Sequence, residues 1–129
     1  MEFLETAKQR LSLKYRDVMT DGFKKYADMM LGADIGGFLL DPKLNVIVER
    51  HGRAQEKAVF STGYQNLIDI ATRLALIDAL YGDNKPPVIL DDPFVNFDET
   101  RTENALKLIE KLSENCQVVY LTCHGSRVP

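Results

Sequence analysis

The chain has 129 residues, which is enough for one domain built around one hydrophobic core. Hydrophobic residues make up 45% and charged residues 27%, a composition that excludes wholesale disorder and a fibrous repeat. The net charge of -3 gives no basic footprint for nucleic acid, and no apolar run approaches the roughly 20 residues of a membrane span, so we expect a cytoplasmic protein without a membrane partner.

Residues 1–33 are predicted to form one long helix that leads into a globular head. Apolar residues between Phe3 and Leu31 recur at steps of three and four, which is the period of an amphipathic helix. The apolar stripe that they form consists of Leu4, Ala7, Leu11, Tyr15, Val18, Met19, Phe23, Tyr26 and Met30. Gly22 is expected to loosen or bend this helix, because glycine leaves the backbone free. The pattern fits both the end of a coiled-coil arm and an ordinary surface helix.

Residues 34–60 are predicted to form a small antiparallel β-meander. The three expected strands are Phe38–Leu40, Leu44–Glu49 and Ala58–Phe60, and the segments between them are rich in turn residues. Alternation along the middle strand places Val46 and Val48 on one face.

Residues 61–129 are predicted to form an α/β unit with parallel strands. The expected elements are a largely buried helix, a central strand, a second helix and a further strand, over Asn66–Tyr81, Val88–Leu90, Glu99–Glu114 and Gln117–Thr122. Sites in such a unit lie at the carboxyl ends of the strands. The two cysteines, Cys116 and Cys123, are expected to be reduced thiols, since no zinc-type Cys/His spacing accompanies them.

The end of the central strand carries the clearest chemical signal. Asp91 and Asp92 leave the strand with their carboxylates on different sides, so one can hold a metal ion while the other faces water, although turns also favour Asp. Asp98 precedes a helix and suits an N-cap.

Two further segments carry residues suited to phosphate chemistry. Ser61-Thr62-Gly63 precedes a helix N-terminus, where backbone amides make either an anion site or a simple cap. His124 follows the last strand, at the edge where α/β sheets bind ligands.

In this order the segments resemble the C-terminal lobe of ABC-class ATPase heads of the coiled-coil type, the group of structural maintenance of chromosomes (SMC) proteins, RecN, RecF and the double-strand-break-repair ATPases. The resemblance covers Phe60 to His124 and implies the C-terminal half of a P-loop NTPase head. The resemblance implies that the signature residues Ser61, Thr62 and Gly63 contact the nucleotide of the opposite head. It implies that Asp91 binds magnesium, that Asp92 is the general base and that His124 senses the γ-phosphate. Asn96 and Asp98 are the implied residues of the D-loop.

Two positions depart from the family pattern. Asp92 stands where a glutamate is usual, which implies slower or differently gated hydrolysis rather than its loss. Thr62 stands where a second glycine is common, but this change keeps the backbone amides that contact phosphate.

The phosphate-binding Walker A motif, G-x-x-x-x-G-K-[ST], occurs nowhere in these 129 residues. The resemblance places that motif in an N-terminal lobe of the same protein, so this chain alone is expected to bind ATP weakly or not at all. ATP and Mg²⁺ are the implied cofactors, and the N-terminal lobe and a second head are the implied partners. DNA and a nuclease partner, and with them a role in DNA repair or chromosome maintenance, follow from the resemblance alone.

Two other functions remain open from the residues. One is a non-enzymatic dimerisation or interaction module. The other is a magnesium-dependent phosphotransfer or nuclease domain in which Asp91, Asp92 and Asp98 bind the ion.

Overall fold

The computed structural model describes residues 2–41, 45–56 and 60–129. Within them the elements follow in the order α1 (Glu2–Leu31), β1 (Phe38–Leu40), β2 (Val46–Arg50), β3 (Arg53–Glu56), α2 (Thr62–Tyr81), β4 (Val88–Asp91), α3 (Glu99–Leu112), β5 (Val118–Leu121) and the 3-10 helix η2 (Gly125–Arg127). The predicted α/β fold, with a long first helix and an antiparallel meander, is confirmed.

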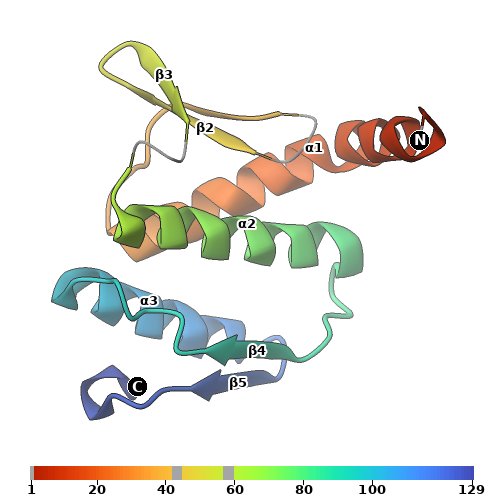
Figure 1. Cartoon of the computed structure of the whole chain (residues 1–129). Coiled ribbons are helices and arrows are strands. Elements are labelled where there is room, and N and C mark those ends of the chain that lie inside the picture. Colours follow the sequence, from red (N-terminus) through yellow and green to blue (C-terminus); the bar gives the residue numbers. More distant parts are fainter. Residues whose placement is uncertain (1, 42–44, 57–59) are drawn as a thin grey trace.

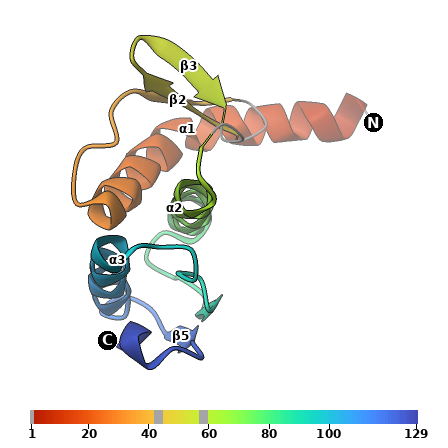
Figure 2. The same cartoon turned by 60° about the vertical axis from the view of Figure 1, so that its left-hand side comes forward.

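The elements are arranged in layers around α2. The meander lies on one side of α1 and α2, and α3 lies with β4 and β5 on the other side (Figure 1). Figure 2 shows α2 nearly end-on, with the meander above it and the strand pair below it. None of the helices among the described residues combines the length and the apolar character that a membrane span requires.

The C-terminal half of α1 supplies its part of the core. Its buried apolar side chains follow the helical spacing, and they are Met19, Phe23, Tyr26, Ala27 and Met30. Val18, also in the apolar stripe, is 49% exposed. The first members of the stripe, Leu4, Ala7 and Leu11, fall outside the described side chains.

Gly22 has a packing role in α1. The helix continues through this position without interruption, and Gly22 is buried. A Cβ atom there would lie 3.2 Å from the Cβ and 3.3 Å from the Cα of Ala75 on α2. Glycine therefore lets the two helices approach closely.

The meander has the strand order β1-β2-β3, with both pairs antiparallel. Val46 and Val48 are buried and Glu49 is exposed, as alternation predicted. The third strand is Arg53–Glu56 and not Ala58–Phe60, of which residues 58 and 59 lie outside the described part of the chain. The reason is the two-residue His51-Gly52 turn: both residues have positive φ, 53° and 74°, which is the tight hairpin geometry that starts the next strand at once.

Capping residues set where α2 and α3 begin. Ser61 caps α2, so this helix starts at Thr62, four residues before the predicted Asn66. Asp98 caps α3, as predicted.

β4 and β5 form a parallel pair with Val88 opposite Val118 and Asp91 opposite Leu121. One face of this pair turns to the core, where Val88 is buried. The other face is open and apolar, with Ile89 68%, Val119 37% and Leu121 50% exposed. An exposed apolar sheet face of this kind needs a covering layer in a complete α/β fold.

Candidate functional site

Asp92 lies at the carboxyl end of β4, where the chain turns sharply. Its backbone N–H donates to the carbonyl of Leu121 at 2.6 Å, which continues the parallel pairing for one more residue. Its φ of 43° lies in the left-handed region, which Asp adopts more readily than most residues but still at a cost of about 1 kcal/mol or more. Such strain is typical of functional sites.

Four side chains from the segment after β5 surround the Asp92 carboxylate, which is 24% exposed. Thr122 Oγ1 donates to Asp92 Oδ1 at 3.3 Å, and Cys123 Sγ donates to Oδ2 at 3.2 Å. His124 Nε2 lies 3.8 Å from Oδ2, and Arg127 Nη1 lies 4.0 Å from Oδ1. The bond to Asp92, followed by desolvation, raises the pKa of the Cys123 thiol, because the carboxylate stabilises its protonated form.

Two further hydrogen bonds fix this segment. The backbone N–H of His124 donates to Thr122 Oγ1 at 3.1 Å. Arg127 Nη2 donates to the carbonyl of Val95 at 3.3 Å, which connects η2 to the turn after β4. The carboxyl ends of β4 and β5 are thus bound to each other through side chains as well as through the sheet.

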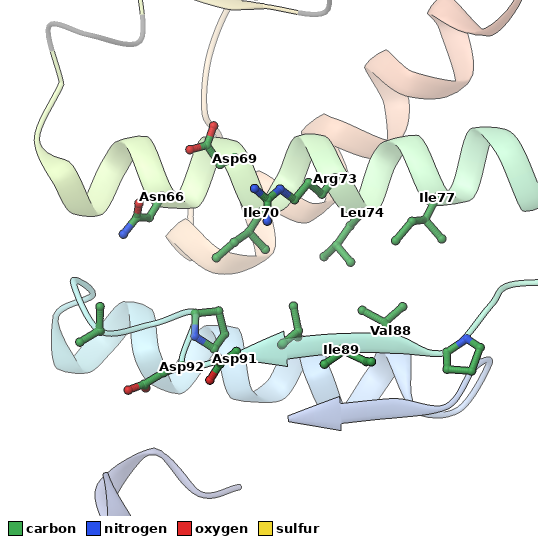
Figure 3. Close-up of a pocket in the computed structure, with 14 residues that line it drawn as sticks. Asn66, Asp69, Ile70, Arg73, Leu74, Ile77, Val88, Ile89, Asp91 and Asp92 are labelled. Atoms are coloured by element: carbon green, nitrogen blue, oxygen red, sulfur yellow. The ribbon is translucent and has the colours of Figure 1, made fainter. Parts of the chain in front are cut away.

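Asp91 and Asp92 both line a groove of about 550 Å³ between α2 and β4 (Figure 3). The α2 face contributes Asn66, Asp69, Ile70, Arg73, Leu74 and Ile77, and the chain from 87 to 95 contributes Pro87, Val88, Ile89, Leu90, Pro93 and Val95. Asp91 is exposed, whereas Asp92 is enclosed by its contacts. The two neighbouring carboxylates therefore have different surroundings. An accessible carboxylate such as that of Asp91 is an oxygen ligand that suits Mg²⁺.

The N-terminus of α2 holds the Ser61-Thr62-Gly63 segment. Tyr64 N–H donates to Ser61 Oγ at 3.3 Å, so the predicted cap is present. Ser61 and Thr62 are exposed, and the first turn carries no acidic residue that would oppose an anion. Gly63 is buried, and a Cβ on it would lie 2.5 Å from the carbonyl oxygen of Asn96, closer than real Cβ atoms come.

A tight turn between β4 and α3 supplies that Asn96 carbonyl. Phe97 N–H donates to the carbonyl of Phe94 at 3.0 Å, and the two buried rings stack 5.2 Å apart. Asp98 Oδ1 then accepts the N–H of Arg101 at 2.7 Å and so caps α3. The aromatic anchors leave Asn96 exposed at the tip of the turn.

A cluster of aromatic rings and cations lies behind the start of α2. The guanidinium of Arg50 on β2 lies 4.7 Å from the ring of Tyr64 and 5.1 Å from that of Phe60. The guanidinium of Arg101 on α3 lies 5.7 Å from the same Tyr64 ring. No spacing in the sequence links these residues, because β2, α2 and α3 each supply one part. The nearest sequence signal is the Phe-Ser-x-Gly-Tyr run itself.

The structure brings the predicted residues together in two groups. Asp92 and His124 meet at the carboxyl ends of the parallel strands, with Asp91 beside them. Gly63 and Asn96 meet at the start of α2. The roles expected for these residues in nucleotide binding and hydrolysis stay predictions.

Solved structures with this arrangement are SMC head domains. A structure from work on ATP-driven dimerization and DNA stimulated activation of SMC ATPases has a TM-score of 0.71 at 16% identity, over 93% of this chain and 75% of that one. The Smc head domain of Pyrococcus furiosus, with an extended coiled coil and bound to the C-terminal domain of ScpA, has a TM-score of 0.68 at 14% identity, over 98% and 33%. The SMC head domain from Thermotoga maritima has a TM-score of 0.64 at 19% identity, over 95% and 43%. The chain therefore has the fold of the C-terminal lobe of an SMC-type ABC ATPase head.

Among proteins compared by sequence, the chain is similar to the uncharacterized protein YhaN of Bacillus subtilis (strain 168). The two are 35% identical over 80 residues, which is 61% of this chain and 8% of YhaN. The chain thus spans a small part of the length of this relative. No protein-family model matches the chain.

Proposed function

We propose that this chain is the C-terminal lobe of an ATP-hydrolysing head in a DNA-repair or chromosome-maintenance ATPase of the cytoplasm. The observation that carries the proposal is the meeting of Asp92 and His124, 3.8 Å apart at the ends of two paired parallel strands. In α/β proteins the carboxyl ends of the strands are where ligands bind. Asp91, the residue before Asp92, adds an exposed carboxylate, so the site has two acidic groups in different surroundings.

Asp92 is proposed as the general base of the reaction. Thr122 donates to its Oδ1 atom, Arg127 Nη1 lies 4.0 Å from the same atom, and Oδ2 faces Cys123 and His124. The carboxylate takes the proton of a water molecule while that water attacks the terminal phosphorus of ATP, and ADP leaves with the electron pair of the broken P–O bond. His124 donates a hydrogen bond to the charge that develops on the terminal phosphate. Magnesium, when held by Asp91 directly or through water, would neutralise charge on the phosphates.

The start of α2 is proposed to act on the nucleotide of a second head. Ser61 and Thr62 are exposed, and the free N–H groups of a 20-residue helix point out of its first turn, which itself carries no acidic residue. The contact of Gly63 with Asn96 connects this helix to the proposed D-loop, Asn96 to Asp98. A displacement of either one is therefore transmitted to the other.

The remaining parts of the ATP site are proposed to come from an N-terminal lobe that carries a Walker A motif. Two features support this: the groove between α2 and β4, and the exposed apolar face with Ile89, Val119 and Leu121. An additional layer of strands and helices would cover that face, as parallel sheets require. Head dimerisation then pairs two such composite sites.

The test uses the chain together with its N-terminal lobe. Asp92→Asn keeps the shape of the side chain and removes the base, so we expect ATP binding and ATP-dependent dimerisation to persist while hydrolysis falls at least 100-fold. Asp83→Asn is the matched control, because Asp83 is an exposed aspartate in the loop before β4. Unchanged hydrolysis in Asp92→Asn refutes the assignment, and dimerisation without hydrolysis in the wild type supports a purely structural module instead.

DNA is the partner class that we propose for the complete protein. The support is the SMC-type fold alone, because the net charge of -3 gives no electrostatic indication of DNA binding. Stimulation of the ATPase rate by double-stranded DNA, lost at high salt, is the expected result. A rate that is independent of DNA would remove this part of the proposal, including the expected nuclease partner, and leave the ATPase assignment intact.

A further inference from the structure

Three different metal-binding side chains meet at the carboxyl ends of β4 and β5. They are the carboxylate of Asp92, the thiol of Cys123 and the imidazole of His124, and one ligand atom from each lies within 4.8 Å of the others. Cys123 and His124 are adjacent in the sequence, and Asp92 joins them only through the parallel pairing of the strands. This explains why no zinc-type spacing is visible along the chain.

We propose that Asp92, Cys123 and His124 form a site for Zn²⁺ or a similar transition-metal ion, distinct in chemistry from the magnesium site proposed at Asp91. A thiolate and an imidazole are ligands that zinc prefers and that Mg²⁺ does not. Two negative ligands balance the charge of a divalent ion. Three protein ligands leave one tetrahedral position open to water.

Two of the three separations between ligand atoms are close to those that a tetrahedral zinc site needs, and the third, between the Cys123 and His124 atoms, is within 4.8 Å. With Zn–S near 2.3 Å and Zn–N and Zn–O near 2.0 to 2.1 Å, two ligand atoms lie about 3.3 to 3.6 Å apart. Asp92 Oδ2 is 3.2 Å from Cys123 Sγ and 3.8 Å from His124 Nε2. Both separations differ from the ideal by a few tenths of an ångström, which small side-chain rotations can provide because Cys123 and His124 are exposed.

The two oxygens of Asp92 have separate partners. Oδ2 faces the two other ligands, whereas Oδ1 faces Thr122 Oγ1 at 3.3 Å and Arg127 Nη1 at 4.0 Å. The Thr122 hydroxyl also accepts the backbone N–H of His124, so one side chain orients two of the ligands. Outer hydrogen bonds of this kind commonly fix metal ligands. The positive charge of Arg127 repels a cation, but it lies beside Oδ1, which is not the oxygen proposed to bind the metal.

Metal binding requires the thiolate form of Cys123. The thiol now donates its hydrogen to Asp92 Oδ2; when the ion binds, that proton leaves to solvent and both atoms become ligands. If the proposed function also holds, the bound ion occupies the base and the phosphate-sensing histidine, so zinc inhibits ATP hydrolysis. That consequence rests on the proposed function, whereas the binding site does not.

Cobalt binding by the 129-residue chain, in the absence of nucleotide, tests the site directly. Co²⁺ in a tetrahedral thiolate site gives a sulfur-to-cobalt charge-transfer band and intense visible bands, and Zn²⁺ abolishes both by displacing it. We expect one Co²⁺ per chain, loss of the charge-transfer band in Cys123→Ser, and at least tenfold weaker binding in His124→Asn and Asp92→Asn.

The chain offers matched controls, because it has only two cysteines and two histidines. Cys116→Ser and His51→Asn remove the same side chains elsewhere, and both variants are expected to bind Co²⁺ as the wild type does. Circular dichroism confirms that each variant is folded. The proposal is refuted if the wild type gives no charge-transfer band, if the band survives Cys123→Ser, or if Cys116→Ser or His51→Asn abolishes it. Because no ATP is present, this result is independent of the ATPase test.

Discussion

Asp78 on α2 binds three basic or phenolic groups from other parts of the chain, and its replacement by Asn gives a sharp test of how α1 is fixed to α2. Tyr26 on α1 donates its hydroxyl to Asp78 Oδ2 at 2.5 Å, Lys85 Nζ lies 2.9 Å from Oδ1, and Lys25 Nζ lies 3.6 Å from Oδ2. The side chains of Asp78 and Lys85 are 17% and 16% exposed. Asp78→Asn keeps the shape but removes the charge.

The expected loss of stability follows from these contacts. A hydrogen bond to an ionised group contributes about 1.5 to 3 kcal/mol. The contribution of the Lys85–Asp78 ion pair to stability lies between those of two classes of pair. An exposed pair contributes up to about 1 kcal/mol, and breaking a buried pair costs about 3 to 5 kcal/mol. Because Asn still accepts one neutral hydrogen bond, we expect the free energy of unfolding to fall by about 2 to 3 kcal/mol.

The pH dependence provides the decisive measurement. Burial opposes ionisation of Asp78, but the bond from Tyr26 and the charges of Lys85 and Lys25 outweigh it and hold the pKa below its ordinary value of 3.8. The stabilisation is therefore complete above that value and is lost as the pH falls through the pKa of the folded state. Urea unfolding of wild type and Asp78→Asn should differ fully at pH 7, and the difference should begin to shrink only below pH ~4. A difference that is absent at pH 7, or that does not shrink in acid, refutes the reasoning.

Three other substitutions test separate contacts. Gly63→Ala should lower the free energy of unfolding by about 1 to 3 kcal/mol, because the new Cβ meets the Asn96 carbonyl. Gly125→Ala, which has open space around it, should leave that free energy unchanged. Equal urea midpoints for the two variants would contradict the close contact. Asp98→Ala should cost about 1 kcal/mol through loss of the α3 cap and Asp98→Ser should restore most of it, as thermal unfolding would show. Ile89→Asp should leave the stability of this chain within about 0.5 kcal/mol and abolish co-purification with the N-terminal lobe; retained co-purification would exclude this face from the interface.

The helices and parallel strands were predictable because each leaves a local signal in the sequence. Apolar spacing located α1, α2 and α3, and two β-branched runs located β4 and β5. The third meander strand was not predicted correctly. The apolar pattern indicated a strand at Ala58–Phe60, whereas the strand that pairs with β2 is the polar segment Arg53–Glu56. There the backbone conformation of the His51-Gly52 turn decided the register, and a hydrophobic pattern does not record it.

The candidate site was predictable only in part, for a similar reason. The order of the Ser61, Asp92 and His124 segments indicated the class of fold, and the structural comparisons agree with it. The surroundings of Asp92 depend on the register between β4 and β5, which brings Thr122, Cys123 and Arg127 to a residue about 30 positions earlier. The sequence separately displays a free thiol and a histidine, but only the pairing of the strands makes them neighbours of the carboxylate.

The contacts of α2 explain how events at the proposed site would reach the long helix. At its first turn α2 contacts the Asn96 carbonyl through Gly63, and further along it contacts α1 through Ala75, opposite Gly22, and through Asp78. Close-packed contacts do not deform smoothly, so we expect a shift of the turn after β4 to move α2 as a unit. Since α1 is bound to α2 at two points one turn apart, we expect α1 to follow that movement rather than slide. We therefore expect the pair of helices to convert a change beside Asp92 into a reorientation of the N-terminal helix.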